Sequence, residues 1–210
     1  TEDPDAIQAS LPPGLFVDTF EGEAYLGAVP FFMERIRPRF LPPVPGISWF
    51  LEFNLRTYVH DSQGRPGVWF YSLDANQTLA VALARRFFHL PYFRAKMHAQ
   101  LENGTMTYAS HRRGTTVPDS MQYDIPEGSM CQAEPETLEF FLLERYRLFA
   151  FQKNRNQLFS GRVHHHPYPF AEVTPHTFQT NLETIFSTAG FSPPGNQPTA
   201  LHYSSGVNVR

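Results

Sequence analysis

Three polar side chains alternate with apolar ones along the segment from Phe50 to Val59. Glu52, Asn54 and Arg56 would share one face of a strand, because strand side chains alternate between the two faces. A carboxylate and a guanidinium on one face could bind an organic acid and place a proton donor or acceptor beside it. We therefore take Glu52 as a candidate catalytic residue and Asn54 and Arg56 as candidate ligand-binding residues. The alternative is that this face is solvated, as one face of an antiparallel sheet usually is.

A second group of charges lies in the run from Glu144 to Arg147. If this run is a strand, Arg145 and Arg147 share a face and could meet Glu52 or an anionic ligand. They could equally belong to an interior salt-bridge network without any role in chemistry. Arg145 is therefore a further candidate ligand-binding residue.

The sequence contains few of the motifs that bind metals or cofactors. His164 and His166 would share a face of a strand, and two imidazoles so placed could hold zinc only with a third ligand. The chain has one cysteine, Cys131, and no His-Glu-x-x-His motif. It also has no phosphate-binding glycine loop, nucleophile elbow or dinucleotide fingerprint. We expect no metal and no cofactor.

The composition is typical of a globular protein rich in strands. Of its 210 residues, 20 are Phe and 9 are Tyr, which favour strands, and 19 are Pro, which predict many loops. A net charge of -3 gives no basic field for nucleic acid, and no apolar run approaches the ~20 residues that span a bilayer. A lone cysteine fits a reducing compartment. We expect a cytoplasmic protein with a small-molecule ligand and with neither nucleic acid nor membrane as a partner; self-association through the Phe-rich strands is a further option.

Local patterns predict the elements that position the polar residues. The segments Phe50–Val59 and Val68–Leu73 are typical of two paired strands of a hairpin. Asp74, with Gln77 three residues later, resembles a capping box that opens a helix. The pair Leu90-Pro91 ends this helix, and a return strand follows.

The rest of the chain also carries recognisable signals. Pro4–Ser10 can form a short helix, and Asn103-Gly104 is the strongest hairpin turn. Either Glu134 or Thr137 can open a short helix or a turn. Thr177–Ala189 has the pattern of an amphipathic helix. The proline-rich stretch Arg37–Ser48 is best explained as a loop, or as a lid. No repeat or linker divides the chain.

Several longer sequence segments resemble those of a known family. The segments are NLRTYV, PGVWFYSLDA, FHLPYFRAKM, FLLERYRLF and VHHHPYPF, and the match runs from about Leu11 to Val209. The chain resembles the YqjF-like bacterial proteins (domain of unknown function 2071) of the acetoacetate decarboxylase-like superfamily. The resemblance implies a single α+β domain over residues 1–210, with a strongly bent antiparallel sheet that forms a closed or nearly closed β-barrel with flanking helices. It also implies one further strand before Thr1.

The same resemblance bears on the site. The superfamily lines its barrel lumen with polar residues and places a glutamate on a strand similar to that of Glu52. Acetoacetate decarboxylases carry a Phe-Pro-Lys-Lys turn whose lysine forms a Schiff base, but here the turn reads Leu90-Pro91-Tyr92-Phe93. A phenol cannot replace an amine in that chemistry. Lys96 would share the face of Tyr92, although lysines are rarely buried.

The sequence therefore predicts a barrel pocket for a small organic molecule, such as a carboxylate. Tyr92 joins Glu52 as a candidate catalytic residue, either as a hydrogen-bond donor or as a weak acid, although aromatic residues at strand starts most often serve packing. An enzyme of this kind would be a lyase or hydrolase of small organic acids that does not use a Schiff base. The alternative is a non-catalytic ligand sensor or interaction module that kept the fold and lost the lysine.

Overall fold

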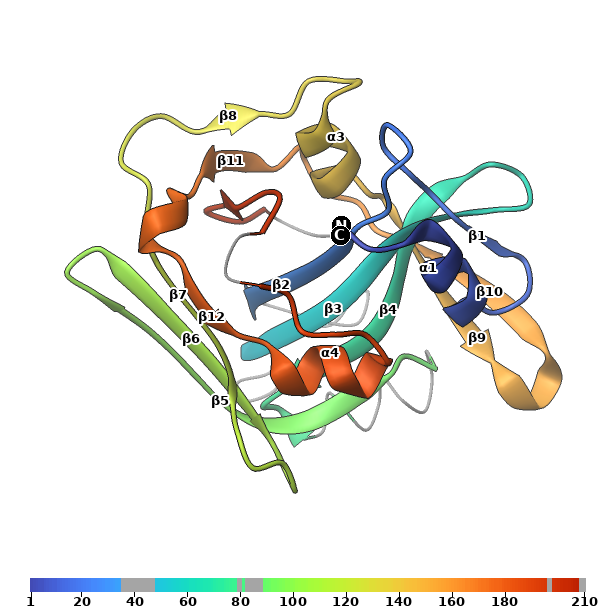
Figure 1. Ribbon diagram of the computed structural model, residues 1–210, viewed down its shortest axis with the longest axis horizontal. Coiled ribbons are helices and arrows are strands. Elements are labelled where there is room, and N and C mark those ends of the chain that lie inside the picture. Colours follow the sequence, from blue (N-terminus) through green and yellow to red (C-terminus); the bar gives the residue numbers. More distant parts are fainter. Residues whose placement is uncertain (35–47, 79–80, 82–88, 196–197, 208–210) are drawn as a thin grey trace.

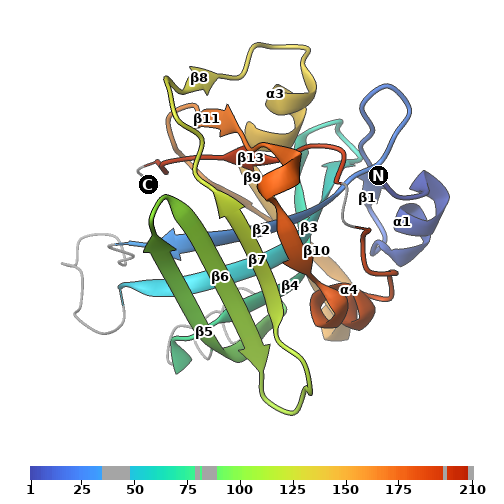
Figure 2. The same cartoon turned by 60° about the vertical axis from the view of Figure 1, so that its left-hand side comes forward.

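The protein is mostly β, with a strongly curled half-barrel of mixed strands and few helices (Figure 1). The computed structural model describes residues 1–34, 48–78, 81, 89–195 and 198–207. Within this part, ten strands form one curled sheet and three short strands form a second sheet. Strands β5, β6 and β7 run at a steep angle to β2 and β3, which gives the curl (Figure 2).

The bounds of the elements are as follows. The strands are β1 Leu15–Val17, β2 Leu26–Met33, β3 Phe50–Asp61, β4 Pro66–Ala75, β5 Tyr92–Glu102, β6 Thr105–Arg112, β7 Asp119–Asp124, β8 Cys131–Gln132, β9 Arg147–Gln152, β10 Gln157–Arg162, β11 Pro169–Glu172, β12 Gln179–Asn181 and β13 His202–Tyr203. The helices are α1 Pro4–Ser10, α3 Leu138–Leu143 and α4 Glu183–Ala189, with 3-10 turns at Lys153–Arg155 and Pro175–Thr177.

The β3–β4 hairpin is the centre of the sheet, and it carries a bulge. Leu55 pairs with Ser72 and Arg56 pairs with Phe70, so Tyr71 is an extra residue on β4. A bulge of this kind bends the strand and increases its twist. Strand β2 pairs along β3 on the other side. The hairpin predicted from the alternating pattern is confirmed.

Two parallel pairings extend this antiparallel unit. Strand β5 returns parallel to β4, and β9 also pairs parallel to β4 near its beginning. The second pairing depends on Gly67, because a Cβ there would lie only 2.7 Å from the carbonyl oxygen of Arg147. The sheet is therefore mixed, whereas the family resemblance implied an antiparallel sheet.

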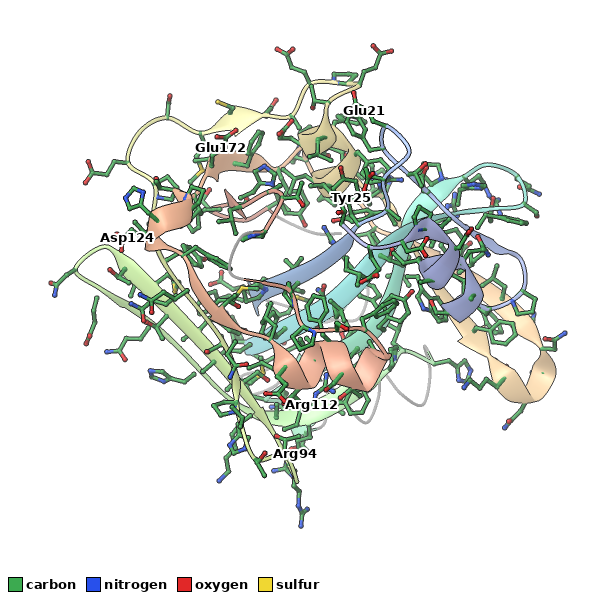
Figure 3. All side chains as sticks on the ribbon, in the orientation of Figure 1. Glu21, Tyr25, Arg94, Arg112, Asp124 and Glu172 are labelled. Atoms are coloured by element: carbon green, nitrogen blue, oxygen red, sulfur yellow. The ribbon has the colours of Figure 1, made fainter. Side chains whose placement is uncertain are left out.

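The two faces of β3 pack against different parts of the chain. Phe53 and Leu55 join the largest buried cluster, in which Tyr108 of β6 and Ile185 of α4 also take part. On the opposite face, Tyr58 packs in a second cluster with residues of α3. This second cluster includes Tyr25, which lies beside α3 in Figure 3 and whose ring centre is 5.9 Å from that of Phe141. Both faces of β3 are thus buried.

Short elements with strong local signals form as predicted. Helix α1 spans Pro4–Ser10, and the side chain of Thr137 caps α3 by accepting from the backbone N–H of Phe140 at 3.2 Å. The turn between β5 and β6 contains Asn103 and Gly104, both with positive φ. These signals depend only on neighbouring residues, so the sequence is sufficient to predict them.

Three local predictions are wrong. Asp74 caps no helix, because it belongs to β4 and its carboxylate is bonded to other strands. The helix predicted over Thr177–Ala189 forms only in its second half, since Gln179–Asn181 pairs with β7 as strand β12. The strand expected to reach His166 ends at Arg162.

Some expectations cannot be compared with the structure. Nearly all of the loop predicted over Arg37–Ser48 and most of the helix expected after Asp74 lie outside the described residues. Among the helices that are described, none is both long and apolar enough to cross a membrane.

Candidate functional site

Glu52 lies in the middle of the central sheet, on the face opposite Phe53. Its cross-strand neighbours are Phe31 on β2 and Ala75 on β4. The residue is only 2% exposed. Glu52 is therefore not part of a solvated face, which removes the simplest alternative to a role in a site.

Tyr92 holds the carboxylate of Glu52. It is the first residue of β5 and pairs with Leu73 on β4, which in turn pairs with Asn54 on β3, so the three share the face of Glu52. The hydroxyl of Tyr92 donates to Oε2 of Glu52 at 2.7 Å. The structure thus brings together the two residues that the sequence suggested as catalytic candidates.

Burial controls the acidity of this pair. It raises the pKa of Glu52 to about 7, because the charged form is poorly solvated there, and the nearby charge of Asp74 acts in the same direction. Interactions with the side chains of Tyr92 and Asn54 lower the pKa and only partly offset burial. The pKa of Tyr92 is raised above its usual range by burial and by the Glu52 charge, so the phenol stays protonated and acts as a donor. The result is a carboxyl group poised near neutral pH.

Asn54 and Arg56 continue the row along β3 towards α3. Asn54 is 2% exposed, and its Oδ1 atom is buried without a hydrogen-bond partner in the part of the chain that the structure describes. Arg56 donates from one terminal nitrogen to the carbonyl oxygen of Leu142 at 3.0 Å and lies 5.5 Å from the ring centre of Tyr58. Its Nε atom is buried and has no hydrogen-bond partner among the residues whose positions are described. Arg56 therefore does not touch Glu52.

Arg145 lies beside Arg56 rather than beside Glu52. Its guanidinium pairs with Asp18 at 2.6 Å, donates to the carbonyl oxygen of Phe141 at 2.7 Å and lies 5.4 Å from the ring centre of Tyr58. The residue sits in the irregular segment between α3 and β9, so the strand alternation assumed for it does not apply. The structure brings the two arginines together around Tyr58.

A second buried charge cluster lies on the opposite face of the sheet. Asp74 accepts from Nε of Arg112 at 2.6 Å and from the hydroxyl of Ser110 at 2.7 Å. Arg112 stacks on Phe93, with its central carbon 4.3 Å from the ring centre, and lies close to α4 (Figure 3). Asp119 of β7 is nearby and raises the number of buried charges to three. Sequence reasoning missed this cluster, although Asp74 near the end of β4 and Arg112 at the end of β6 were a visible signal.

Asp119 connects this cluster to helix α4. Its Oδ1 accepts from the backbone N–H groups of Thr184 and Ile185 at 2.9 and 3.1 Å. Leu182, the residue before the helix, offers no side-chain cap of its own. Burial raises the pKa of Asp119 to about 6, against the effect of these hydrogen bonds. Asp119 therefore caps α4 from a neighbouring strand.

The remaining candidates lie at the surface. Lys96 is exposed on β5, and His164 and His166 are exposed in the loop after β10. Within the described ranges, no group of three or more His, Cys, Asp and Glu side chains could hold a metal ion.

Comparison with solved structures identifies the class of fold. The chain superimposes on the acetoacetate decarboxylase of Legionella pneumophila with a TM-score of 0.61 and 13% identity, covering 99% of this chain and 77% of that one. An acetoacetate decarboxylase-like enzyme from Sphingomonas wittichii RW1 gives a TM-score of 0.56 and 13% identity, covering 99% of this chain and 82% of that one. The protein thus has an acetoacetate decarboxylase-like fold.

Sequence comparison then gives the family. A family model for DUF2071, described as an uncharacterized conserved protein (COG2071), matches residues 2–208. The uncharacterized protein YqjF of Bacillus subtilis (strain 168) is 36% identical over 203 residues, which are 97% of this chain and 81% of that protein. The chain belongs to the DUF2071 family, and the resemblance noted in its sequence is confirmed.

Proposed function

We propose that the protein binds a small organic acid beside Glu52 and that Glu52 exchanges a proton with this ligand. The observation that carries the proposal is a buried carboxyl group with a pKa of about 7, held at 2.7 Å by a phenol that stays protonated. A general acid or base works best when its pKa lies near the working pH. Glu52 would populate both protonation states in a neutral solution.

The energetic cost of this arrangement supports a functional role. Raising the pKa of Glu52 from 4.5 to about 7 corresponds to about 3 kcal/mol of lost stability at high pH, since one pKa unit is about 1.4 kcal/mol. Strongly shifted pKa values cluster at functional sites, and Glu52 differs from Asp74 and Asp119 because neither an ion pair nor a helix N-terminus among the described residues accounts for its burial.

The position of Tyr92 decides which chemistry is proposed. The solved neighbours are described as acetoacetate decarboxylases, and the resemblance of the turn Leu90-Pro91-Tyr92-Phe93 to the Phe-Pro-Lys-Lys turn suggests that Tyr92 stands where those enzymes carry a reactive lysine. The two lysines of this chain, Lys96 and Lys153, are both exposed. We therefore propose a lyase or hydrolase reaction in which Glu52 moves the proton and Tyr92 donates a hydrogen bond. Arg56 and Asn54 would bind the ligand, and Arg145 would position Arg56 through Tyr58.

A ligand screen with a proton-exchange readout tests this proposal. Acetoacetate, 4-oxopentanoate, 5-oxohexanoate and 7-oxooctanoate, in which the oxo group lies progressively further from the carboxylate, would be mixed with the protein in D2O, and binding and deuterium incorporation beside the oxo group would be followed by NMR. We expect at least one acid to bind and to exchange faster than in buffer. Glu52→Gln should slow the exchange by a factor of about 100 or more while keeping the binding, since general acid–base catalysis typically contributes such factors.

A matched control separates this effect from a general change of charge. Glu102→Gln removes an exposed carboxylate at the end of β5 and should leave the exchange rate unchanged. Binding without exchange would contradict the catalytic part of the proposal and would favour the ligand sensor. If no acid of the panel binds, the proposal as a whole is wrong.

A further inference from the structure

The row of Glu52, Asn54 and Arg56 is longer than a two- or three-carbon acid. Residues Glu52 and Arg56 are four positions apart on β3, which corresponds to about 13 Å between their Cα atoms at about 3.3 Å per residue. The guanidinium of Arg56 contacts the carbonyl oxygen of Leu142 and the ring of Tyr58, so it lies at the opposite end of the row from Glu52. A ligand that touches both ends of this row must be extended.

The charges along the row also differ from end to end. Glu52 has no cation among the groups that shift its pKa, and Asp74 adds a second negative charge near it. A short acid bound there would place its carboxylate against the Glu52 carboxylate, which like-charge repulsion disfavours. Arg56 forms no salt bridge with any residue in the described ranges. A ligand carboxylate therefore fits better at Arg56 than at Glu52.

Two unpartnered atoms define what the ligand should offer. Among the described residues, Nε of Arg56 is a buried donor without an acceptor, and Oδ1 of Asn54 is a buried acceptor without a donor, on a residue that is 2% exposed. Leaving such atoms unpaired in a buried place is costly, so a ligand that pairs them gains affinity. The matching groups are a carboxylate at Arg56 and a hydroxyl or N–H group at Asn54.

Strand β2 flanks this row along its length. On β2, Gly27, Val29 and Phe31 lie opposite Arg56, Asn54 and Glu52, respectively, and all three are only half-buried. At Gly27 an added Cβ would lie 3.0 Å from the hydroxyl of Tyr58 and 3.6 Å from Cγ of Arg56. The glycine leaves space where the side chain of Arg56 passes over β2.

We propose that the ligand is an extended organic acid with a hydroxyl or N–H group on its chain, bound with its carboxylate at Arg56 and its other end at Glu52. This inference rests on the proposed function, because it assumes that the Glu52 face binds a ligand. It adds the length of the ligand and its direction along β3.

A series of hydroxy acids of increasing length tests the proposed length of the ligand directly. Binding of 3-hydroxypropanoate, 4-hydroxybutanoate, 6-hydroxyhexanoate and 8-hydroxyoctanoate would be followed by isothermal titration calorimetry at pH 7. We expect the affinity to rise at least tenfold from the shortest acid to the longest. The uncharged 1,8-octanediol should bind the wild-type protein at least tenfold more weakly than 8-hydroxyoctanoate, because it has no carboxylate for Arg56. This comparison needs no variant.

Variants then locate the carboxylate. Arg56→Met keeps most of the side-chain length and should abolish the advantage of the long acids, and Arg56→Lys should retain part of it. Arg155→Met, which removes an exposed arginine of the turn after β9, should change the affinities less than twofold. Equal affinity for all lengths, or for acid and diol, would overturn this inference. If Glu52→Gln still slows proton exchange in that case, the proposed function stands; if no hydroxy or oxo acid binds at all, both are wrong.

Discussion

Two buried carboxyl groups lie next to each other on the β3–β4 ladder but on opposite faces, and their surroundings differ. Asp74, paired with Phe53, receives a charged hydrogen bond from Arg112 and a second bond from Ser110. Glu52 lies one rung away and is held by the neutral hydroxyl of Tyr92.

The difference shows that a buried carboxyl group can have either a structural or a reactive role, depending on its neighbours. Burial raises the pKa of Asp74 as well, but the Arg112 cation opposes this rise, and the ion pair between the two side chains links β4 to β6. Glu52 has no cation of this kind among the described residues, and its pKa rises to about 7. The Asp74 cluster therefore has the properties of a structural element, whereas the Glu52 pair has those of a reactive one. Four predictions test this contrast between the two carboxyl groups.

Breaking the charged cluster should have the largest effect. Arg112→Met leaves Asp74 and Asp119 buried without their cation, and the loss of one partner of a buried ion pair typically costs about 3–5 kcal/mol. Urea unfolding at pH 7 measures this cost. The matched control is Arg113→Met, which removes the exposed neighbour and should cost less than about 0.5 kcal/mol. Equal stabilities of the two variants would contradict the structural role of the cluster.

Substitution of Glu52 should have the opposite effect and increase the stability of the protein at high pH. Because the folded-state pKa of about 7 lies above the ordinary value of 4.5, the folded state loses stability as the pH rises between these two values. Glu52→Gln removes this loss, so the variant should be more stable than the wild type by about 2–3 kcal/mol at pH 8 and little different at pH 4.5. Thermal or urea unfolding across this pH range checks the sign. A variant that is less stable at pH 8 would show that the carboxylate supports the fold.

A smaller effect is expected where Asp119 caps α4. Asp119→Ala removes the acceptor for the N–H groups of Thr184 and Ile185 and should cost about 1–2 kcal/mol. Asp119→Asn keeps an oxygen in place and should cost less. Hydrogen exchange of the Ile185 amide should speed up in the alanine variant. Unchanged exchange there would rule out the cap.

The smallest effect concerns the hydrogen bond in the reactive pair. Tyr92→Phe removes the donor that lowers the pKa of Glu52, so this pKa should rise above 7 by up to about one unit. Carbon-13 NMR titration of the Glu52 carboxyl measures it directly. A fall in the pKa would mean that Tyr92 does not donate to the charged form.

The sequence predicts the fold well where local signals agree with tertiary contacts. The alternation in β3 and the Asn103-Gly104 turn predicted strands that the structure contains. The pattern of Thr177–Ala189 was helical throughout, but pairing with β7 converts its first part to a strand. The pairing partner β7 is distant in the sequence, so the residues of this segment alone could not predict the strand.

The candidate site shows the same limit. The period of two placed Glu52, Asn54 and Arg56 on one face, and the family resemblance pointed to Tyr92. Sequence alone could not show that Arg145 turns to Asp18, because the two residues come together only when α3 packs on the sheet. Residues far apart in the chain also form the Asp74–Arg112 ion pair, which explains why Asp74 was misassigned as a helix cap.

Gly67 has a consequence for the order in which the protein folds. The hairpins β3–β4 and β5–β6 join neighbouring segments, and such local contacts form early and at low entropic cost. The parallel pairing of Val68 with Leu148 closes a much longer loop, and it requires the backbone of β9 to approach Gly67 more closely than any side chain at that position would allow. Docking of β9 should therefore be a late step, and a substitution at Gly67 should act mainly by speeding unfolding while folding of the hairpins proceeds at its usual rate.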